Sequence, residues 1–311
     1  MPERGFFLQD APMFIRASME VYPRLHHVSL GATSRYAIVA ENGEITLTDP
    51  GASAHMESLE ERLERLGLSL RRVTRVLITH LDADRVGALP LLRKKLPELR
   101  VLGGAGMAAE LANDDFVLSA ISRDAEIRQS LGLPVGALPS PAEFRKALQF
   151  EKCIVDGETI TIDDDITVRC VASPGHRNHS MGYLVLPHRF LITDETLGYY
   201  NGRRLAAPGA NASVSASLES IGRLKDLEIS GIGFSYGGCI TGDLVRKHLE
   251  AIVQNTNDLI SEVKRARAEG IQDEEIRSQI RDAFYAPGLR DLCLLRSLEE
   301  SFSAVLAQVS K

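Results

Sequence analysis

The sequence predicts an α/β layered fold, because short strands and helices alternate through its first hundred residues. β-rich runs at 26–31, 35–41 and 44–49 surround an Asn-Gly pair typical of a two-residue hairpin turn. Later runs alternate between helix and strand: a helix at 54–67, a strand at 75–80, a helix at 88–96 and a strand at 100–104. This order is typical of helices that cover a sheet.

The rest of the chain continues the pattern with helical additions. Residues from about 108 to 150 have helical spacing with a Pro/Gly/Ser-rich interruption, which indicates a helical insertion. Short strands resume between 153 and 194, and the segment after 245 reads as helix. We therefore expect one domain over 1–245, with the insertion at about 108–150, and a helical C-terminal extension over 246–311 packed on it.

Composition and charge narrow the class of protein. The 311 residues are 44% hydrophobic and 25% charged, which is typical of a globular protein with a full core. A net charge of −6 gives no electrostatic reason to expect nucleic acid or an anionic membrane as partner. The N-terminus lacks the apolar stretch of a signal peptide, and the four cysteines lack CxxC spacing. We expect a cytoplasmic protein without a membrane-spanning segment.

Histidine and aspartate recur where predicted strands end. His80, Asp82 and Asp84 follow one strand, His176 follows another in "SPGHRNHSMGYL", and Asp194 follows a third in "LITDETLG". Imidazole nitrogens and carboxylate oxygens are ligands for a borderline divalent metal, and the strand ends of a layered fold share one edge. A metal site competes here with a plainer interpretation, a solvated acidic turn beside hydrogen-bonded histidines.

The segments also resemble, in order, the motifs of the metallo-β-lactamase fold superfamily. The matching stretches cover roughly residues 20 to 245 and read "TDPGA", "LITHLDADRVGAL", "SPGHRNHSMGYL", "LITDETLG" and "SYGGCITGD". The resemblance implies an αββα four-layer sandwich with a helical insertion and a helical C-terminal extension. Asp82 at the second motif position looks most like the flavodiiron and oxygen-binding diiron branch, which uses an HxExD sequence.

The resemblance also implies a set of ligands. It places His80, Asp82 and His176 on a first metal, Asp194 as a bridging carboxylate and Asp84 on a second metal. Two positions depart from the family pattern, because Arg85 and Tyr236 stand where histidines are expected. Arginine cannot ligate a metal and tyrosine does so only when ionised. We therefore expect one ion rather than two.

Further roles follow for neighbouring residues. Asp84 would act as the catalytic general base, and Arg85 could bind a phosphate or carboxylate of the substrate. Tyr236 could ligate as a tyrosinate, His179 could support a ligand from behind, and Asp49 at the "DxG" position would orient loops through hydrogen bonds.

Three functions remain open at this point. The first is a metal-dependent hydrolase that acts through a metal-bound water on a small-molecule substrate. The second is a non-haem iron protein that binds or senses O₂. The third is a metal-free scaffold in which an Arg85–Asp84 ion pair replaces the cation. Asp82 in place of a histidine favours iron, followed by zinc or manganese. The amphipathic insertion could cap the site or mediate a homodimer.

Overall fold

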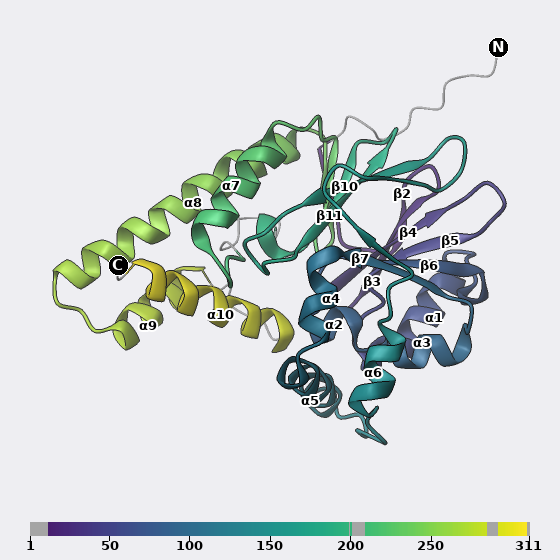
Figure 1. The fold of residues 1–311 in the computed structure, drawn as a ribbon. Helices are drawn as coiled ribbons and strands as arrows, with labels where there is room; N and C mark the ends of the chain where they lie inside the picture. The colour runs from purple at the N-terminus through teal and green to yellow at the C-terminus, as the bar shows by residue number, and fades with distance from the viewer. Residues whose placement is uncertain (1–11, 199, 201–208, 285–291, 310–311) are drawn as a thin grey trace, which may run out of the picture.

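Two seven-stranded sheets stack face to face in the computed structural model, with helices on their outer faces (Figure 1). The structure describes residues 12–198, 200, 209–284 and 292–309. This four-layer αββα arrangement confirms the fold class expected from the sequence.

The first sheet carries the strand that leads to His80. Its order is β2-β3-β4-β5-β6-β7-β8. The strands up to β5 pair antiparallel, and β5 to β8 pair in parallel. Their bounds are β2 (Met19–Tyr22), β3 (Leu25–Leu30), β4 (Thr33–Val39), β5 (Ile45–Thr48), β6 (Val73–Ile78), β7 (Arg100–Gly104) and β8 (Lys152–Ile154).

The second sheet carries the strands that lead to His176 and Asp194. Its order is β1-β14-β13-β12-β11-β10-β9, with one parallel pair, β12 with β13. The bounds are β1 (Met13–Ile15), β9 (Thr159–Thr161), β10 (Thr167–Ala172), β11 (Met181–Leu186), β12 (Phe190–Ile192), β13 (Gly231–Gly233) and β14 (Cys239–Thr241).

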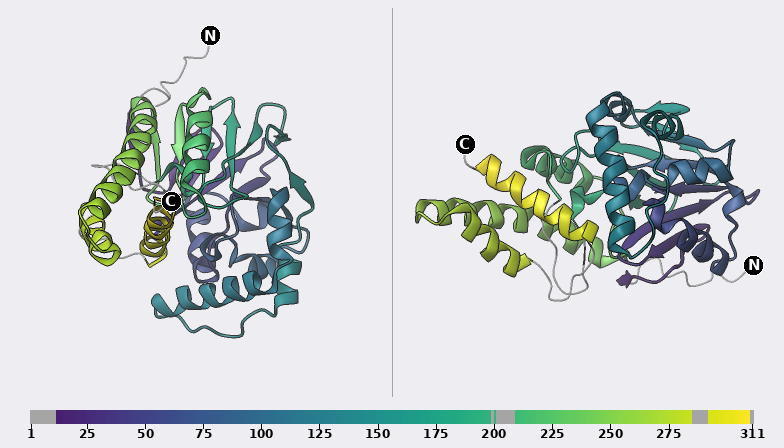
Figure 2. Two further views of the ribbon diagram at one scale, coloured as in Figure 1. Left: turned by 60° about the vertical axis from the view of Figure 1, so that its left-hand side comes forward. Right: turned by 90° about the horizontal axis from the view of Figure 1, so that it is seen from below.

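Helices cover both sheets because the strands bury apolar side chains on both faces. In β11, Tyr183 and Val185 face the core between the sheets, whereas Leu184 faces the helices outside, as the two-residue period of a strand requires. Helices α1 (Met56–Arg65) and α3 (Leu89–Lys95) pack on the first sheet. Helices α7 (Val214–Lys225) and α8 (Asp243–Ala268) pack on the second (Figure 2).

Two further helical regions complete the fold. Helices α4 (Ala105–Leu111), α5 (Asp114–Ser130) and α6 (Pro141–Ala147) lie between β7 and β8. Asn113 caps α5 and a Ser140–Glu143 capping box begins α6. The helical arm consists of α8, α9 (Asp273–Phe284) and α10 (Leu292–Val309), and α10 returns toward α5 (Figures 1 and 2).

Some expectations from the sequence change or stay open. The Asn42-Gly43 hairpin has a three-residue loop, because Ala40 and Glu44 still pair around it. The division at residue 245 stays a prediction. Among the described residues, no helix combines the length and apolar character needed to cross a bilayer.

Candidate metal centre

The candidate site lies at the seam between the two sheets. His80 follows β6 of the first sheet, and His176 follows β10 of the second. Two contacts fix these strand ends across the core: the Tyr183 hydroxyl donates to the Ile78 carbonyl at 2.6 Å, and the Met181 amide donates to the Thr79 carbonyl at 2.9 Å. The histidines therefore sit on segments whose backbones are held in place.

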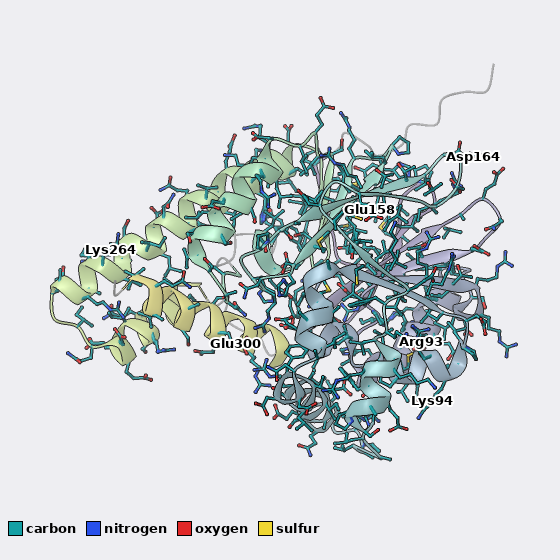
Figure 3. All side chains as sticks on the ribbon, in the orientation of Figure 1. Arg93, Lys94, Glu158, Asp164, Lys264 and Glu300 are labelled. Carbon is teal, nitrogen blue, oxygen red and sulfur yellow. The ribbon has the colours of Figure 1, made fainter. Side chains whose placement is uncertain are left out.

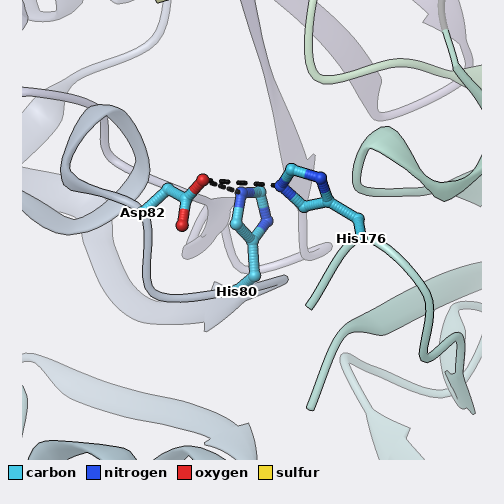
Figure 4. A group of neighbouring side chains, drawn as sticks. All are labelled: His80, Asp82 and His176. Carbon is cyan, nitrogen blue, oxygen red and sulfur yellow. Dashed lines mark ion pairs between the residues drawn. The ribbon is translucent and has the colours of Figure 1, made fainter. Parts of the chain in front are cut away.

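Three of the expected ligands come together as one group (Figure 4). The Oδ2 atom of Asp82 lies 3.7 Å from His80 Nε2 and 3.4 Å from His176 Nε2. Asp82 is the N-cap residue of α2 (Ala83–Val86), yet its side chain caps no helix amide. Its carboxylate is therefore directed at the histidines rather than at its own helix.

Glu195 is a further member of the site that the sequence analysis missed. Its Oε2 atom lies 2.9 Å from His176 Nε2 and 3.2 Å from His80 Nε2, and its side chain is buried. Among the described residues, none of these three atoms has a hydrogen-bond partner. Buried polar atoms without partners are costly, so three of them facing one another fit a cation between them.

Asp194 lies beside this group, but both of its carboxylate oxygens accept hydrogen bonds within its own turn. Its Oδ1 accepts the Thr196 amide at 3.0 Å, and its Oδ2 accepts the Thr196 hydroxyl at 3.1 Å. It thereby caps the short helix η4 (Glu195–Leu197). Its carboxylate still falls within reach of a second ligand group with His80 and Glu195. The turn that Asp194 caps presents Glu195 to the histidines.

Arg85 and Asp84 form a buried pair next to the ligand group. The Nη2 atom of Arg85 lies 2.8 Å from Asp84 Oδ2 and 3.1 Å from Glu195 Oε1. The Tyr236 hydroxyl donates to the same Asp84 oxygen at 2.7 Å, and the Tyr236 ring lies under the guanidinium at 4.5 Å. Asp84 belongs to neither ligand group among the described residues. The guanidinium lies between the two carboxylates as a fixed positive charge.

Two further arginines compensate charge around the site, and sequence reasoning found neither. Arg177 holds Asp82 through a bidentate pair, with Nε to Oδ1 at 2.8 Å and Nη2 to Oδ2 at 2.9 Å. Arg35 is fully buried and donates to the Asp84 carbonyl at 2.5 Å. Burial lowers the pKa of Arg35 to about 10, which still leaves it charged at neutral pH.

Asp49 is linked to His80 through Thr79. The Thr79 hydroxyl donates to Asp49 Oδ2 at 2.7 Å, and the Thr79 amide donates to Asp49 Oδ1 at 2.8 Å. The same hydroxyl lies 2.9 Å from His80 Nδ1. Since its proton goes to Asp49, the hydroxyl accepts from Nδ1–H, which leaves the Nε2 lone pair facing the site.

His179 lies apart from both ligand groups and packs on α4. A Cβ atom on Gly106 would come within 1.9 Å of the His179 ring, so the ring lies directly against the helix backbone. It therefore lies against α4, three residues beyond His176 in the chain.

The charges of the site call for one more cation. Carboxyl groups outnumber guanidinium groups around the site: those of Asp49, Asp82, Asp84, Asp194 and Glu195 lie near Arg35, Arg85 and Arg177, and Arg177 also pairs with Glu300. In the metal-free protein, a proton on His176 supplies part of this positive charge. Burial lowers the pKa of His176, but Glu195 and Asp82 outweigh burial and raise it to about 10. Burial raises the pKa of Glu195, but His176, His80 and Arg85 outweigh burial and hold this pKa far below its usual value.

Comparison with known proteins gives a consistent picture. The family profile described as "Metallo-beta-lactamase superfamily" matches residues 30–231. Protein ST1585 of Sulfurisphaera tokodaii, described as containing a metallo-beta-lactamase fold, is 24% identical over 212 residues, which are 68% of this chain and 77% of that protein. The crystal structure of ST1585 matches with a TM-score of 0.60 at 20% identity, covering 91% of this chain and 98% of that one.

Two other solved structures share the fold at lower identity. A metallo-beta-lactamase family protein from Thermus thermophilus, TTHA1429, has a TM-score of 0.62 at 18% identity, covering 93% of this chain and 95% of that one. A B3 metallo-beta-lactamase described as having an active-site glutamic acid has a TM-score of 0.56 at 16% identity, covering 85% and 98%. At these identities the likeness concerns the fold.

Proposed function

The chain belongs to the metallo-beta-lactamase superfamily, and we propose that it is a metal-dependent hydrolase with one divalent ion held between His80, His176 and Glu195. The observation that carries the proposal is a group of three buried atoms, His80 Nε2, His176 Nε2 and Glu195 Oε2, that have no hydrogen-bond partner in the part of the chain that the structure describes. Asp82 and Asp194 lie close enough to complete the donor set.

Arg85 supports one ion rather than two. Glu195 turns one oxygen toward the histidines and the other toward Arg85, so a single carboxylate separates the ligand group from a guanidinium. A second cation near Asp84 would meet that permanent charge at close range in a buried environment. The Tyr236 hydroxyl is engaged in a hydrogen bond to Asp84 at 2.7 Å. In this arrangement Asp84 anchors Arg85 and does not act as the general base.

The donor set defines the chemistry. A divalent ion bound there supplies Lewis acidity, which polarises a carbonyl or phosphoryl oxygen and lowers the pKa of a coordinated water. Asp82 remains 20% exposed, whereas the histidines and Glu195 are buried, so substrate approaches from the side of Asp82. The buried wall formed by Glu195 and Arg85 keeps bulk water from the opposite side.

An iron protein that binds O₂ is the second candidate. The observation that favours it is the carboxylate of Asp82, which faces both histidines. A third imidazole in that place would favour zinc, whereas a carboxylate favours iron. Two imidazoles with several carboxylates suit iron and manganese as well as zinc, so the identity of the metal separates the candidates.

Elemental analysis of protein purified without added metal or chelator tests the proposal. We expect about one ion per chain in the wild type and less than a tenth of that in Glu195→Gln. Asp124→Asn is the matched control, because Asp124 is also a buried carboxylate but accepts from the Ser53 amide outside both ligand groups. The metal-loaded protein should hydrolyse at least one of nitrocefin, p-nitrophenyl acetate and bis-p-nitrophenyl phosphate.

Each other outcome points elsewhere. Two ions per chain would overturn the role given to Arg85. Iron with visible absorption and no hydrolysis would favour the O₂ candidate. No metal after reconstitution would leave the metal-free scaffold.

A further inference from the structure

The carboxylate of Glu300 sits among three donors at the edge of the metal centre. Its Oε2 atom accepts from Arg177 Nη2 at 3.1 Å and from Asn211 Nδ2 at 3.2 Å, and its Oε1 atom lies 3.3 Å from Arg123 Nη1. Figure 3 shows Glu300 midway along α10, the helix that approaches α5. Both oxygens are therefore held by groups outside the helix that carries them.

Two of the three donors, Arg177 and Asn211, have a further partner besides Glu300. Arg177 is fixed by its bidentate pair with Asp82, and Arg123 projects from α5. Asn211 precedes α7, and its Oδ1 atom accepts from the Ser301 hydroxyl, which turns its amide nitrogen toward Glu300. Two guanidinium groups and an amide that converge on one carboxylate have the character of a built anion-binding site.

This position adjoins the candidate reaction centre. The same Arg177 nitrogen, Nη2, donates to Asp82 Oδ2 and to Glu300 Oε2. Asp82 Oδ2 in turn faces His80 and His176. A group in the place of the Glu300 carboxylate therefore lies two hydrogen bonds from the ligand group, on the side where Asp82 is partly exposed.

Glu300 is not the main attachment of its helix. Phe302, Val305 and Leu306 of α10 pack with Leu259 and Val263 of α8 in one apolar cluster. Arg296 also pairs with Glu126 of α5 at 2.8 Å. The Glu300 side chain is 28% exposed, so it can swing into solvent while the helix stays packed.

We propose that Arg123, Arg177 and Asn211 form a subsite for a carboxylate of the substrate, and that Glu300 is an internal occupant which the substrate displaces. The inference rests on the proposed function because it assumes that the protein has a substrate. The anion site itself does not depend on a metal. A carboxylate fits because the present occupant is one and uses both oxygens. Exchange of one carboxylate for another also keeps the charge around Arg177 unchanged.

Binding of acetate to metal-free protein tests the subsite without reference to catalysis. The thermal midpoint is measured against acetate, with chloride at matched ionic strength as the reference, because a ligand of the folded state raises the midpoint by mass action. In the wild type acetate competes with a tethered carboxylate at high effective concentration. In Glu300→Gln we expect acetate to bind at least about tenfold more tightly.

Two further variants locate the effect. Glu126→Gln removes a charge between α5 and α10 without touching the three donors, and it should bind acetate like the wild type. Arg123→Met in the Glu300→Gln background should abolish the gain. Equal acetate affinity in Glu300→Gln and wild type would overturn the proposal, as would a gain that survives loss of Arg123. Tighter binding of inorganic phosphate than of acetate would overturn the carboxylate assignment.

A measurement on the unmodified chain covers the case in which Glu300→Gln does not fold. Acetate should raise amide hydrogen exchange in the part of α10 around Glu300, ahead of the packed residues Phe302, Val305 and Leu306, because displaced Glu300 no longer ties that part to Arg177. Unchanged exchange at saturating acetate would overturn the displacement. A metal-free protein that binds acetate as expected but never takes up metal would separate this inference from the proposed function.

Discussion

Arg85 and Glu195 form a fully buried ion pair, with Nη2 of the arginine 3.1 Å from Oε1 of the glutamate. The other glutamate oxygen, Oε2, faces His176 Nε2 at 2.9 Å. Glu195 therefore connects the fixed charge of Arg85 to the histidines of the candidate metal centre. A change at Arg85 should alter the environment of His176, and a change at His176 should alter that of Arg85.

Arg85→Ala should destabilise the protein by about 3–5 kcal/mol, because it leaves Asp84 and Glu195 buried without their partner. Urea unfolding of metal-free protein measures this loss. Arg246→Ala is the matched control, since Arg246 pairs with Glu250 on an exposed helix face, and it should cost less than about 1 kcal/mol. Similar losses in both variants would contradict the structural role of Arg85.

Thr79→Val should weaken metal binding about 10- to 100-fold with little change in the ligands themselves. The variant loses the hydroxyl that connects Asp49 to His80 Nδ1, so the His80 ring is free to adopt the other tautomer. Competition with a chromophoric chelator measures the affinity. Thr48→Val removes a buried hydroxyl that bonds to Tyr36 backbone atoms away from the ligand groups, and it should leave the affinity unchanged.

Gly209→Ala should displace Glu195 and lower metal affinity by at least about tenfold. An added Cβ atom would lie 2.2 Å from the Glu195 carbonyl oxygen and 2.5 Å from its Cβ, closer than real contacts allow. Gly222→Ala is the control, because a Cβ there meets nothing within 4 Å and alanine favours the helix. Equal affinity in the two variants would show that Glu195 does not bind the ion.

Metal affinity should rise about tenfold per pH unit between about pH 7 and 9. The carboxylates of Glu195 and Asp82 outweigh burial and hold the pKa of His176 at about 10, so its Nε2 must lose a proton before it can bind a cation. Titration calorimetry in two buffers of different ionisation enthalpy should show close to one proton released. Affinity that does not change with pH would contradict this protonation state.

The same raised pKa predicts how the metal-free protein responds to alkali. A histidine with a folded pKa of about 10 and an ordinary value of 6.5 stabilises the folded state fully below pH 6.5. That contribution is lost as the pH rises through about 10. Urea midpoints of metal-free protein between pH 7 and 10 should fall accordingly.

The fold could be predicted from the sequence because its signals are local. The continuous apolar run of β11 and the helical spacing of α1 follow from which side chains are buried, and the sequence displays both directly. The predicted length of the hairpin loop was short by one residue, because an Asn-Gly pair also suits a three-residue loop with Gly43 at positive φ.

The site was only partly predictable because many of its contacts join distant segments. His80, Asp82 and His176 were found from their places after strands, and the structure groups them. Glu195 was missed because Asp194 beside it fitted the motif, and only the turn geometry shows which carboxylate faces the histidines. Arg177 pairs with a residue 95 positions earlier, a relation that no local pattern carries.

The two ligand-bearing edges belong to different sheets, His80 to the first and His176 with Glu195 to the second. A bound ion therefore fastens the halves of the sandwich to each other at one point. Separation of the sheets would require the ion to leave before or during the rate-limiting step, so the loaded protein should persist far longer under denaturing conditions than its equilibrium stability alone implies. The lifetime of the fold would then depend on the supply of metal around it.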